Sequence, residues 1–200
     1  MRFILGSSSP RRRELFASLG ITFEVIKPQI DETQAAGEDP FDYVRRLSRQ
    51  KAAAVAERID TPATILAADT IVLAADTIGV DAAGDILGKP ADVDEAWAML
   101  RRLRGQSHIV CTAFTLLRIT EGDPQQITQA VKTTVHMRDY TDDEIDTYIA
   151  TGDPFDKAGS YAIQHSEFAP VAEINGDYNN VVGLPIDAVR AALERMSYPL

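Results

Sequence analysis

Short apolar runs and helically spaced apolar positions alternate along the first part of the chain. Residues 2–5 form a mostly apolar run that predicts a strand, and residues 15–19 then carry leucine and phenylalanine at helical spacing. Ser9 suits the N-cap of this helix, Pro10 its first position and Gly20 its end. The pattern therefore predicts a strand, a small-residue loop and a helix in succession.

The same alternation continues as far as residue 70. Residues 21–26 predict a second strand with its apolar side chains on one face. A long amphipathic helix is expected over residues 42–58, followed by a buried strand over residues 64–68. This strand runs directly into Asp69 and Thr70, so we expect both residues where the strand ends.

The second half begins with a predicted hairpin and later contains an antiparallel pair. Residues 71–80 and 86–87 are expected to pair around a turn at 81–84. The remaining predicted elements are a helix at 92–103, a strand pair at 109–119 and 126–136, a helix with a capping box at 141–150, a loop-rich stretch with short strands at 151–180, and a helix at 187–196. Because strands and helices alternate first and an antiparallel pair follows, the fold class is α/β with a mixed sheet.

Charge is distributed unevenly along the 200 residues. The formal net charge is −10, which argues against broad binding to nucleic acid. Residues 1–60 nevertheless hold ten of the 20 bases and only nine of the 30 acids. Seven of those bases fall in two groups, at 11–13 and 45–51. Clusters of bases in an acidic protein indicate a local anion site, and the alternative is a solvated helix face.

Composition also limits the cellular setting. Hydrophobic residues make up 45% and charged residues 25%, as in ordinary globular proteins. No apolar run approaches the ~18 residues of a membrane span, and the N-terminal residues do not have the order of a signal peptide. The single cysteine, Cys111, excludes an internal disulfide framework. A cytoplasmic protein without a membrane partner is expected.

The loop from Ser7 to the helix start has the features of an anion site. Backbone N–H groups at a helix N-terminus bind anions, and serine hydroxyls add donors. Arg11 and Arg12 follow Pro10 and carry fork-shaped donors suited to phosphate oxygens. The sequence lacks the usual phosphate-loop, dinucleotide and nucleophile-elbow motifs. The alternative is a capped helix with surface arginines.

Acidic residues supply a second element of candidate chemistry. Asp69 at the end of a buried strand could hold Mg²⁺ or activate water. Glu32, in a polar loop beside Asp31, could add a second carboxylate. The alternatives are that Asp31 and Glu32 are a solvated loop pair and that Asp69 is an ordinary turn residue. Lys51 and Lys89 could serve as point-charge partners of phosphate, or be surface residues.

Five motifs in one order give these residues a common meaning. They are Ser7–Arg12, Ala68–Thr70, Gly88–Pro90, Asp156–Gln164 and Asn175–Pro185. Together they resemble the Maf family of nucleoside triphosphate pyrophosphatases, first described as septum-formation inhibitors. The resemblance covers about residues 3 to 190.

The resemblance implies a fold, a reaction and a cofactor. It implies a single domain over residues 1–200, similar to the inosine-triphosphatase fold, with an elongated mixed sheet flanked by helices and an active-site cleft between two lobes. The substrate would be a nucleoside triphosphate cleaved between the α- and β-phosphates, with Mg²⁺ or Mn²⁺ as the metal. It also implies a homodimer without a stable nucleic-acid partner.

Site roles also follow from the resemblance. Asp69 matches the general base, and Glu32 with Asp69 would hold the metal. The positions matching phosphate-binding residues are Ser7, Arg11, Lys51 and Lys89, and those matching specificity residues are Arg12, Thr70 and Gln164.

Two departures from the family pattern leave alternatives open. The stretch between Asp69 and Lys89 is longer than expected, and it repeats the local sequence around Asp69 at Asp76. Asp69 is the preferred base because it follows the predicted strand. A glycine-rich continuation is also missing after Gln164, where His165 follows.

The paired arginines resemble the branch that prefers dTTP and UTP. The alternatives are a broader house-cleaning pyrophosphatase of modified nucleotides and a non-catalytic nucleic-acid-binding regulator of cell division.

Overall fold

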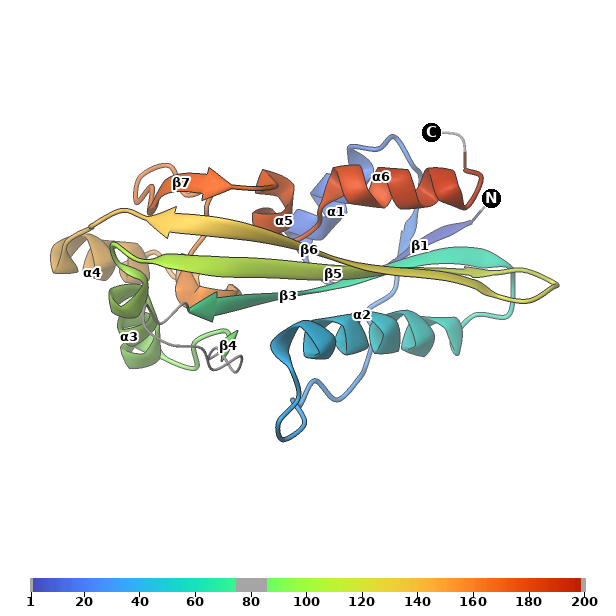
Figure 1. Cartoon of the computed structure of the whole chain (residues 1–200), viewed down its shortest axis with the longest axis horizontal. Coiled ribbons are helices and arrows are strands. Elements are labelled where there is room, and N and C mark those ends of the chain that lie inside the picture. The colour runs from blue at the N-terminus through green and yellow to red at the C-terminus, as the bar shows by residue number, and fades with distance from the viewer. Residues whose placement is uncertain (1, 75–85, 199–200) are drawn as a thin grey trace. The chain divides into compact units, whose positions relative to one another are not determined.

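A computed structural model describes residues 2–74 and 86–198 of the chain (Figure 1). Its strands are β1 (Phe3–Gly6), β2 (Glu24–Val25), β3 (Ala63–Ala74), β4 (Ile86–Leu87), β5 (Ser107–Ile119), β6 (Gln125–Met137) and β7 (Val171–Asn175). They are hydrogen-bonded in the order β2-β1-β3-β5-β6-β7, and β4 pairs with β3 off this path. β1 is parallel to β2 and β3, whereas β3–β4 and β6–β7 are antiparallel. The predicted mixed sheet is therefore confirmed.

Helices connect these strands. They are α1 (Pro10–Ala17), α2 (Pro40–Ala56), α3 (Val93–Leu103), α4 (Asp142–Ala150), α5 (Tyr178–Val182) and α6 (Ile186–Arg195), with short 3₁₀ turns at Asp153–Asp156 and Ala158–Ser160. The predicted start signals are confirmed: Ser9 caps α1 ahead of Pro10, and Thr141 forms a capping box with Glu144. Their side chains satisfy backbone N–H groups that the first helical turn leaves without partners.

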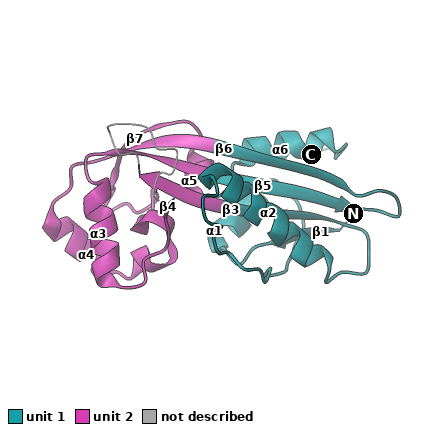
Figure 2. Ribbon diagram, turned by 60° about the horizontal axis from the view of Figure 1, so that its bottom comes forward, with its two compact units in different colours: residues 1–69, 112–131, 183–200 teal, residues 70–111, 132–182 magenta. Residues whose placement is uncertain are grey.

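The chain divides into two compact units (Figure 2). Unit 1 contains residues 1–69, 112–131 and 183–200, and unit 2 contains residues 70–111 and 132–182. Buried apolar side chains form one cluster in unit 2 and two clusters in unit 1. The expectation of a single domain built of two lobes stays a prediction.

The sheet of unit 1 is covered on both faces. Side chains of α1 and α6 pack with Leu66 and Ala68 of β3 in one cluster. Side chains of α2 pack with Ala63, Ile65 and Ala67 in another. Alternate residues of a strand point to opposite faces, so odd-numbered positions of β3 face α2 in this segment. This alternation decides which face the next polar residue joins.

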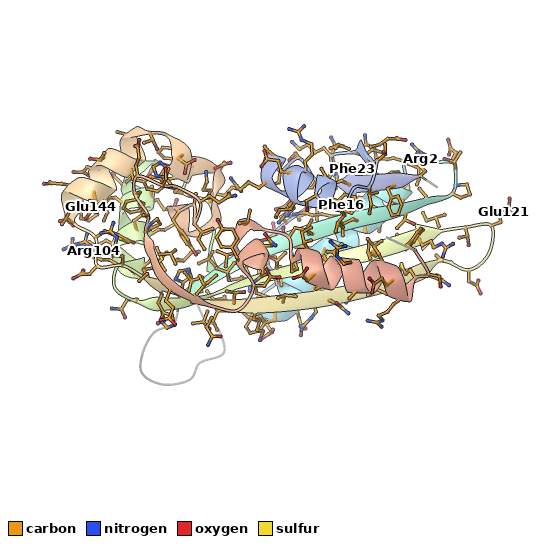
Figure 3. The ribbon with its side chains drawn as sticks, turned by 90° about the horizontal axis from the view of Figure 1, so that it is seen from above. Arg2, Phe16, Phe23, Arg104, Glu121 and Glu144 are labelled. Atoms are coloured by element: carbon orange, nitrogen blue, oxygen red, sulfur yellow. The ribbon has the colours of Figure 1, made fainter. Side chains whose placement is uncertain are left out.

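Aromatic packing supports the N-terminal part of unit 1. Phe16 on α1 is fully buried, and its ring centroid lies 4.8 Å from that of Phe23. Both residues are labelled in Figure 3. The hydroxyl groups of Thr64 on β3 and Tyr198 after α6 are hydrogen-bonded to each other. Residues near both ends of the chain therefore contribute to one core.

Close backbone approach explains the glycine that ends β1. A Cβ atom at Gly6 would lie 3.2 Å from Val55 Cγ2 of α2 and 3.3 Å from Ala67 Cβ. Such contacts are tighter than ordinary packing allows, so glycine lets α2 lie close to β1. The small-residue loop that precedes α1 starts at this point.

Several boundaries differ from those predicted. β2 contains only two residues of the expected strand 21–26, and β3 continues to Ala74 instead of stopping at residue 68. Asp69 and Thr70 therefore lie within a strand, because β3 pairs with β1 before this polar pair and with β4 after it. The arms of the predicted hairpin do pair, with Val72 opposite Leu87, while its turn lies outside the described residues. Within the described part of the chain, no helix is long and apolar enough to cross a membrane.

Candidate active site

The alternation of β3 brings Asp69 to Lys51. Asp69 continues the odd-numbered positions that face α2, and Lys51 precedes Ala52, which packs on that same face. Lys51 Nζ lies 2.5 Å from Asp69 Oδ1, and the lysine is only 7% exposed. A buried ammonium needs a charged partner, and Asp69 supplies it.

Glu32 joins the same ammonium group from a loop. Its Oε1 lies 3.0 Å from Lys51 Nζ, and its side chain is 59% exposed, compared with 13% for Asp69. The Tyr43 hydroxyl donates to the backbone oxygen of Glu32 at 2.7 Å. Lys51 therefore joins one exposed and one largely buried carboxylate.

Arg12 adds positive charge to this group. Its pKa is lowered mainly by burial, and the nearby Asp69 and Glu32 carboxylates oppose that shift while Arg11 reinforces it. Its Nε donates to the backbone oxygen of Gly183 at 2.8 Å. Unit 1 thus brings together Arg12, Asp69, Glu32 and Lys51, with Arg11 close enough to affect the charge of Arg12.

The start of α1 has the geometry expected of an anion site. The Ser9 side chain accepts a hydrogen bond from the backbone N–H of Arg12, and Ser7 Oγ accepts from the backbone N–H of Ser9 at 3.2 Å. Ser7 is buried, whereas Ser8 is exposed. These bonds fix the loop that leads into the helix, where backbone N–H groups converge.

The other predicted site residues belong to unit 2. Thr70 follows Asp69 in β3 and is half-buried, whereas Lys89 and Gln164 are exposed. The backbone N–H of Gly159 donates to the backbone oxygen of Gly88 at 3.0 Å. This bond joins two motifs within unit 2, the one that carries Lys89 and the one that carries Gln164.

The residues of unit 1 suit a divalent metal only in part. Among residues 2–74 and 86–198, no group of three or more His, Cys, Asp or Glu side chains could hold a metal ion. Glu32 and Asp69 nevertheless converge on one cationic group. Mg²⁺ commonly uses one or two carboxylates and takes its other ligands from water and substrate phosphates. The donor set therefore fits a metal that arrives with a nucleotide.

The motifs and the geometry agree with comparison to known proteins. The family model described as Maf-like protein matches residues 2–196. The chain belongs to the Maf family.

Similar Maf relatives are named for one activity. A dTTP/UTP pyrophosphatase of Anaeromyxobacter dehalogenans (strain 2CP-1 / ATCC BAA-258) is 44% identical over 199 residues, covering 100% of this chain and 96% of the relative. One of Geotalea uraniireducens (strain Rf4) is 47% identical over 193 residues, covering 96% of this chain and 94% of the relative.

Solved structures support the expected fold of this Maf chain. The Staphylococcus aureus Ham1 protein matches with a TM-score of 0.52 and 13% identity, covering 98% of this chain and 100% of that structure. A HAM1 protein from Coxiella burnetii matches with a TM-score of 0.51 and 16% identity, covering 98% and 99%. At these identities the likeness shows a shared fold.

Sequence reasoning missed a network of ion pairs around a buried lysine in this Maf chain. Lys157 is 8% exposed, and its Nζ contacts Asp153 Oδ1 at 2.8 Å and Asp156 Oδ1 at 2.6 Å. Tyr148 donates to Asp153 Oδ2 and accepts from the backbone N–H of Ala162. A lysine within a motif otherwise rich in small residues was the signal that could have indicated it.

The alternative base, Asp76, lies outside the described residues.

Proposed function

We propose that this chain hydrolyses dTTP and UTP to the nucleoside monophosphate and pyrophosphate. The proposal rests on the two ion pairs of Lys51, which bring Asp69 and Glu32 together near the charge of Arg12. Catalytic carboxylates beside phosphate-binding cations are what anhydride hydrolysis requires. The names of full-length relatives support dTTP and UTP as the substrates.

The substrate carries several negative charges, so an acidic protein must neutralise it locally. In the proposal, the phosphate-binding residues are Ser7, Arg11, Lys51 and Lys89. Arg12, Thr70 and Gln164 would recognise the nucleotide. A site whose polar groups match one base rejects another because a buried donor or acceptor loses its partner.

Asp69 is the proposed general base. It would accept a proton from the water that attacks the α-phosphorus. The new oxygen–phosphorus bond forms as the bond to the α–β bridging oxygen breaks, and pyrophosphate leaves with that electron pair. Lys51 holds the Asp69 carboxylate in place from α2 and keeps a positive charge near the phosphates.

Glu32 and Asp69 would hold Mg²⁺ or Mn²⁺ when nucleotide is bound. The metal would supply positive charge that stabilises developing negative charge on phosphate oxygens. Because nucleoside triphosphates are cytoplasmic metabolites, the proposed location is the cytoplasm. The proposed assembly is a homodimer without a stable nucleic-acid or membrane partner.

Pyrophosphate release tests the proposal directly. Wild-type protein with Mg²⁺ or Mn²⁺ would be given dTTP, UTP, CTP, 7-methyl-GTP and ITP, beside the Asp69→Asn and Asp76→Asn variants. We expect dTTP and UTP to be the preferred substrates, with turnover lost in Asp69→Asn and kept in Asp76→Asn. The reverse result for the two variants would move the base to Asp76, and no turnover by folded wild-type protein would overturn the function.

A further inference from the structure

We propose that Tyr43 and Arg46 are positioning residues that hold the Glu32 loop, defined as residues 31–38, against helix α2. This inference rests on the proposed function, because it concerns the carboxylate that would help to hold the metal. Neither residue reaches Lys51 or Asp69 through a described hydrogen bond. Each acts instead on the backbone or side chains of the loop.

Glu32 needs such support because its own side chain is mostly exposed. The loop contains no regular helix or strand, and the described side-chain ion pair of Glu32 is the one to Lys51. An exposed ion pair alone holds a flexible side chain weakly, because ordering it costs conformational entropy. The position of Glu32 therefore depends on what fixes its backbone.

Tyr43 fixes that backbone at Glu32 itself. Its hydroxyl donates to the Glu32 backbone oxygen at 2.7 Å. A phenol hydroxyl carries its proton at neutral pH, so it can act as the donor in this bond.

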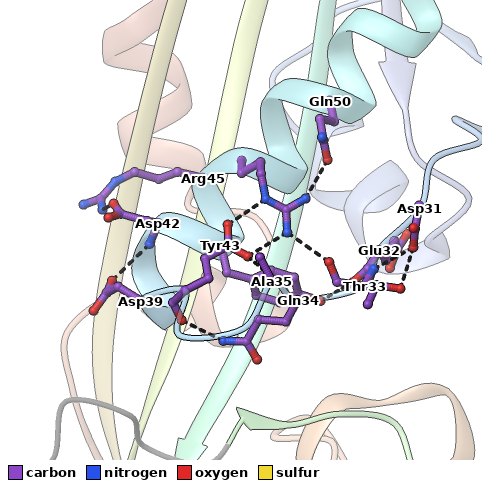
Figure 4. Close-up of polar contacts among 12 residues, drawn as sticks. Asp31, Glu32, Thr33, Gln34, Ala35, Asp39, Asp42, Tyr43, Arg45 and Gln50 are labelled. Carbon is purple, nitrogen blue, oxygen red and sulfur yellow. Dashed lines mark hydrogen bonds and ion pairs between the residues drawn. The ribbon is translucent and has the colours of Figure 1, made fainter.

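Arg46 fixes the loop at two further points. Its Nη2 donates to the backbone oxygen of Thr33 at 3.1 Å. Its Nε and Nη2 form a forked pair with the Glu38 carboxylate at 2.6 and 2.7 Å, while Nη1 donates to Gln50 at 2.9 Å. Figure 4 shows polar contacts of α2 and the loop, with Thr33 of the loop and Gln50 of α2 labelled. Only a planar guanidinium can make this set of contacts at once.

Bonds inside the loop carry the two anchor points along its length. Asp31 Oδ1 accepts from the backbone N–H and the hydroxyl of Thr33. At the other end, Glu38 accepts from the backbone N–H of Ala35 through its carboxylate and from Gln34 through its backbone oxygen. Holding Thr33 and Glu38 therefore restrains the residues between them.

The anchors and the ammonium group belong to one helix. Tyr43, Arg46 and Gln50 are three and four residues apart, so they share one face of α2. Lys51 follows directly on the same rigid element. One helix consequently fixes both the loop that bears Glu32 and the lysine that Glu32 meets, which sets the separation of the two carboxylates.

The test compares Tyr43→Phe and Arg46→Lys with a matched control, Arg45→Lys. Arg45 is the neighbouring arginine of α2, but it contacts Asp42 and the backbone oxygen of Phe41, not the loop. Hydrogen exchange of amides 31–38 measures the loop. Titration with Mn²⁺, with and without a dTTP analogue whose α–β bridging oxygen is replaced by a methylene group, measures metal binding through the paramagnetic resonance signal of the ion. Turnover of dTTP measures activity.

We expect the loop amides to exchange faster and Mn²⁺ affinity to fall about three- to tenfold in Tyr43→Phe, as for the loss of one hydrogen bond. In Arg46→Lys the Mn²⁺ affinity should fall tenfold or more, because a lysine cannot replace the forked pair with Glu38 together with the other contacts of the guanidinium. When Mn²⁺ is raised to a saturating concentration, the turnover number of both variants should return most of the way to the wild-type value. Arg45→Lys should match wild type in all three measurements.

Unchanged exchange of residues 31–38 in both variants would overturn the proposal. Faster exchange with unchanged Mn²⁺ affinity would also overturn it, because the loop would then not position a metal ligand. Absence of dTTP turnover in wild type would instead overturn the proposed function, since the exchange and Mn²⁺ measurements do not depend on hydrolysis. Tyr43→Phe preserves the ring, so it remains informative if Arg46→Lys folds poorly.

Discussion

Arg12 Nε donates to the backbone oxygen of Gly183 at 2.8 Å, across 171 positions of sequence. Gly183 has φ of +126°, a conformation that residues with a Cβ rarely adopt. The direction of its carbonyl group therefore depends on glycine. The C-terminal motif at 175–185 contributes to the site by orienting an arginine of the N-terminal motif through its backbone.

The orientation of Arg12 should affect substrate binding more than chemistry. Arg12→Lys keeps the charge but removes the Nε donor to Gly183. We expect KM for dTTP to rise about tenfold, the scale of one charged hydrogen bond, with kcat within about threefold of wild type. Steady-state kinetics checks this, with Arg13→Lys, an exposed position on the same helix, as the control. A selective fall in kcat would assign Arg12 to the chemical step instead.

The two carboxylates that meet Lys51 should contribute unequally to stability. Asp69→Ala leaves a buried ammonium with one exposed partner and should cost roughly 3 kcal/mol of unfolding free energy. Glu32→Ala removes the exposed partner and should cost at most about 1 kcal/mol. Urea unfolding followed by circular dichroism measures both. Equal losses would show that Glu32 is as firmly held as Asp69.

His108 should make the protein less stable in mild acid. It is fully buried, its Nε2 is hydrogen-bonded to the Tyr161 hydroxyl, and its Nδ1 has no partner within the described residues. Burial, with a smaller contribution from the charge of His136, lowers its pKa to about 4. The unfolded chain therefore binds the proton first, so stability falls as pH drops from about 6.5 towards 4, by roughly 3 kcal/mol in total.

Unfolding free energies at pH 7 and pH 4.5 check this effect. Glu38 and Glu144 have pKa values lowered to about 2 by hydrogen bonds from Arg46 and Arg138. Their contributions are present above pH 4.5 and are lost only at lower pH, so they do not mask the histidine. His108→Gln should remove most of the loss. If His108→Gln kept the wild-type pH dependence, His108 would be excluded as the source of the stability loss.

The network of unit 2 around Lys157 should influence base preference. Tyr148→Phe removes the donor to Asp153 and the acceptor for the backbone N–H of Ala162, two residues before Gln164. We expect the ratio of kcat/KM for dTTP over CTP to fall at least threefold, because the segment that carries Gln164 loosens. Tyr178→Phe, at an exposed tyrosine of the same unit, serves as the control. An unchanged ratio would separate this network from specificity.

Local signals in the sequence were sufficient for most helices but not for the length of β3. Ser9 and Thr141 identified helix starts because capping depends on neighbouring residues alone. The polar pair Asp69–Thr70 suggested the end of a strand. However, β3 pairs with β1 before this pair and with β4 after it, so the strand continues through it. Long-range pairing overrode the local pattern.

The sequence predicted candidate residues for the site but not their arrangement, and the roles of these residues stay predictions. The sequence predicted Lys51 and Asp69 as candidates, and the alternation of β3 against α2 explains why they meet. The contacts of Arg12 with Gly183 and of Arg46 with the Glu32 loop join distant or irregular segments. No periodic pattern marks such contacts.

The division of unit 1 into three chain segments has a consequence for protein synthesis. Arg12 is made 171 residues before the Gly183 carbonyl that orients it, an interval of roughly 10–30 s at ordinary elongation rates. β1 and β3 can pair while the ribosome is still working, but helix α6 is needed to cover their other face. A nascent chain interrupted before this point has Asp69, the proposed general base, and lacks the oriented arginine. Truncated products of translation should therefore be inactive towards the cell's nucleotide pool.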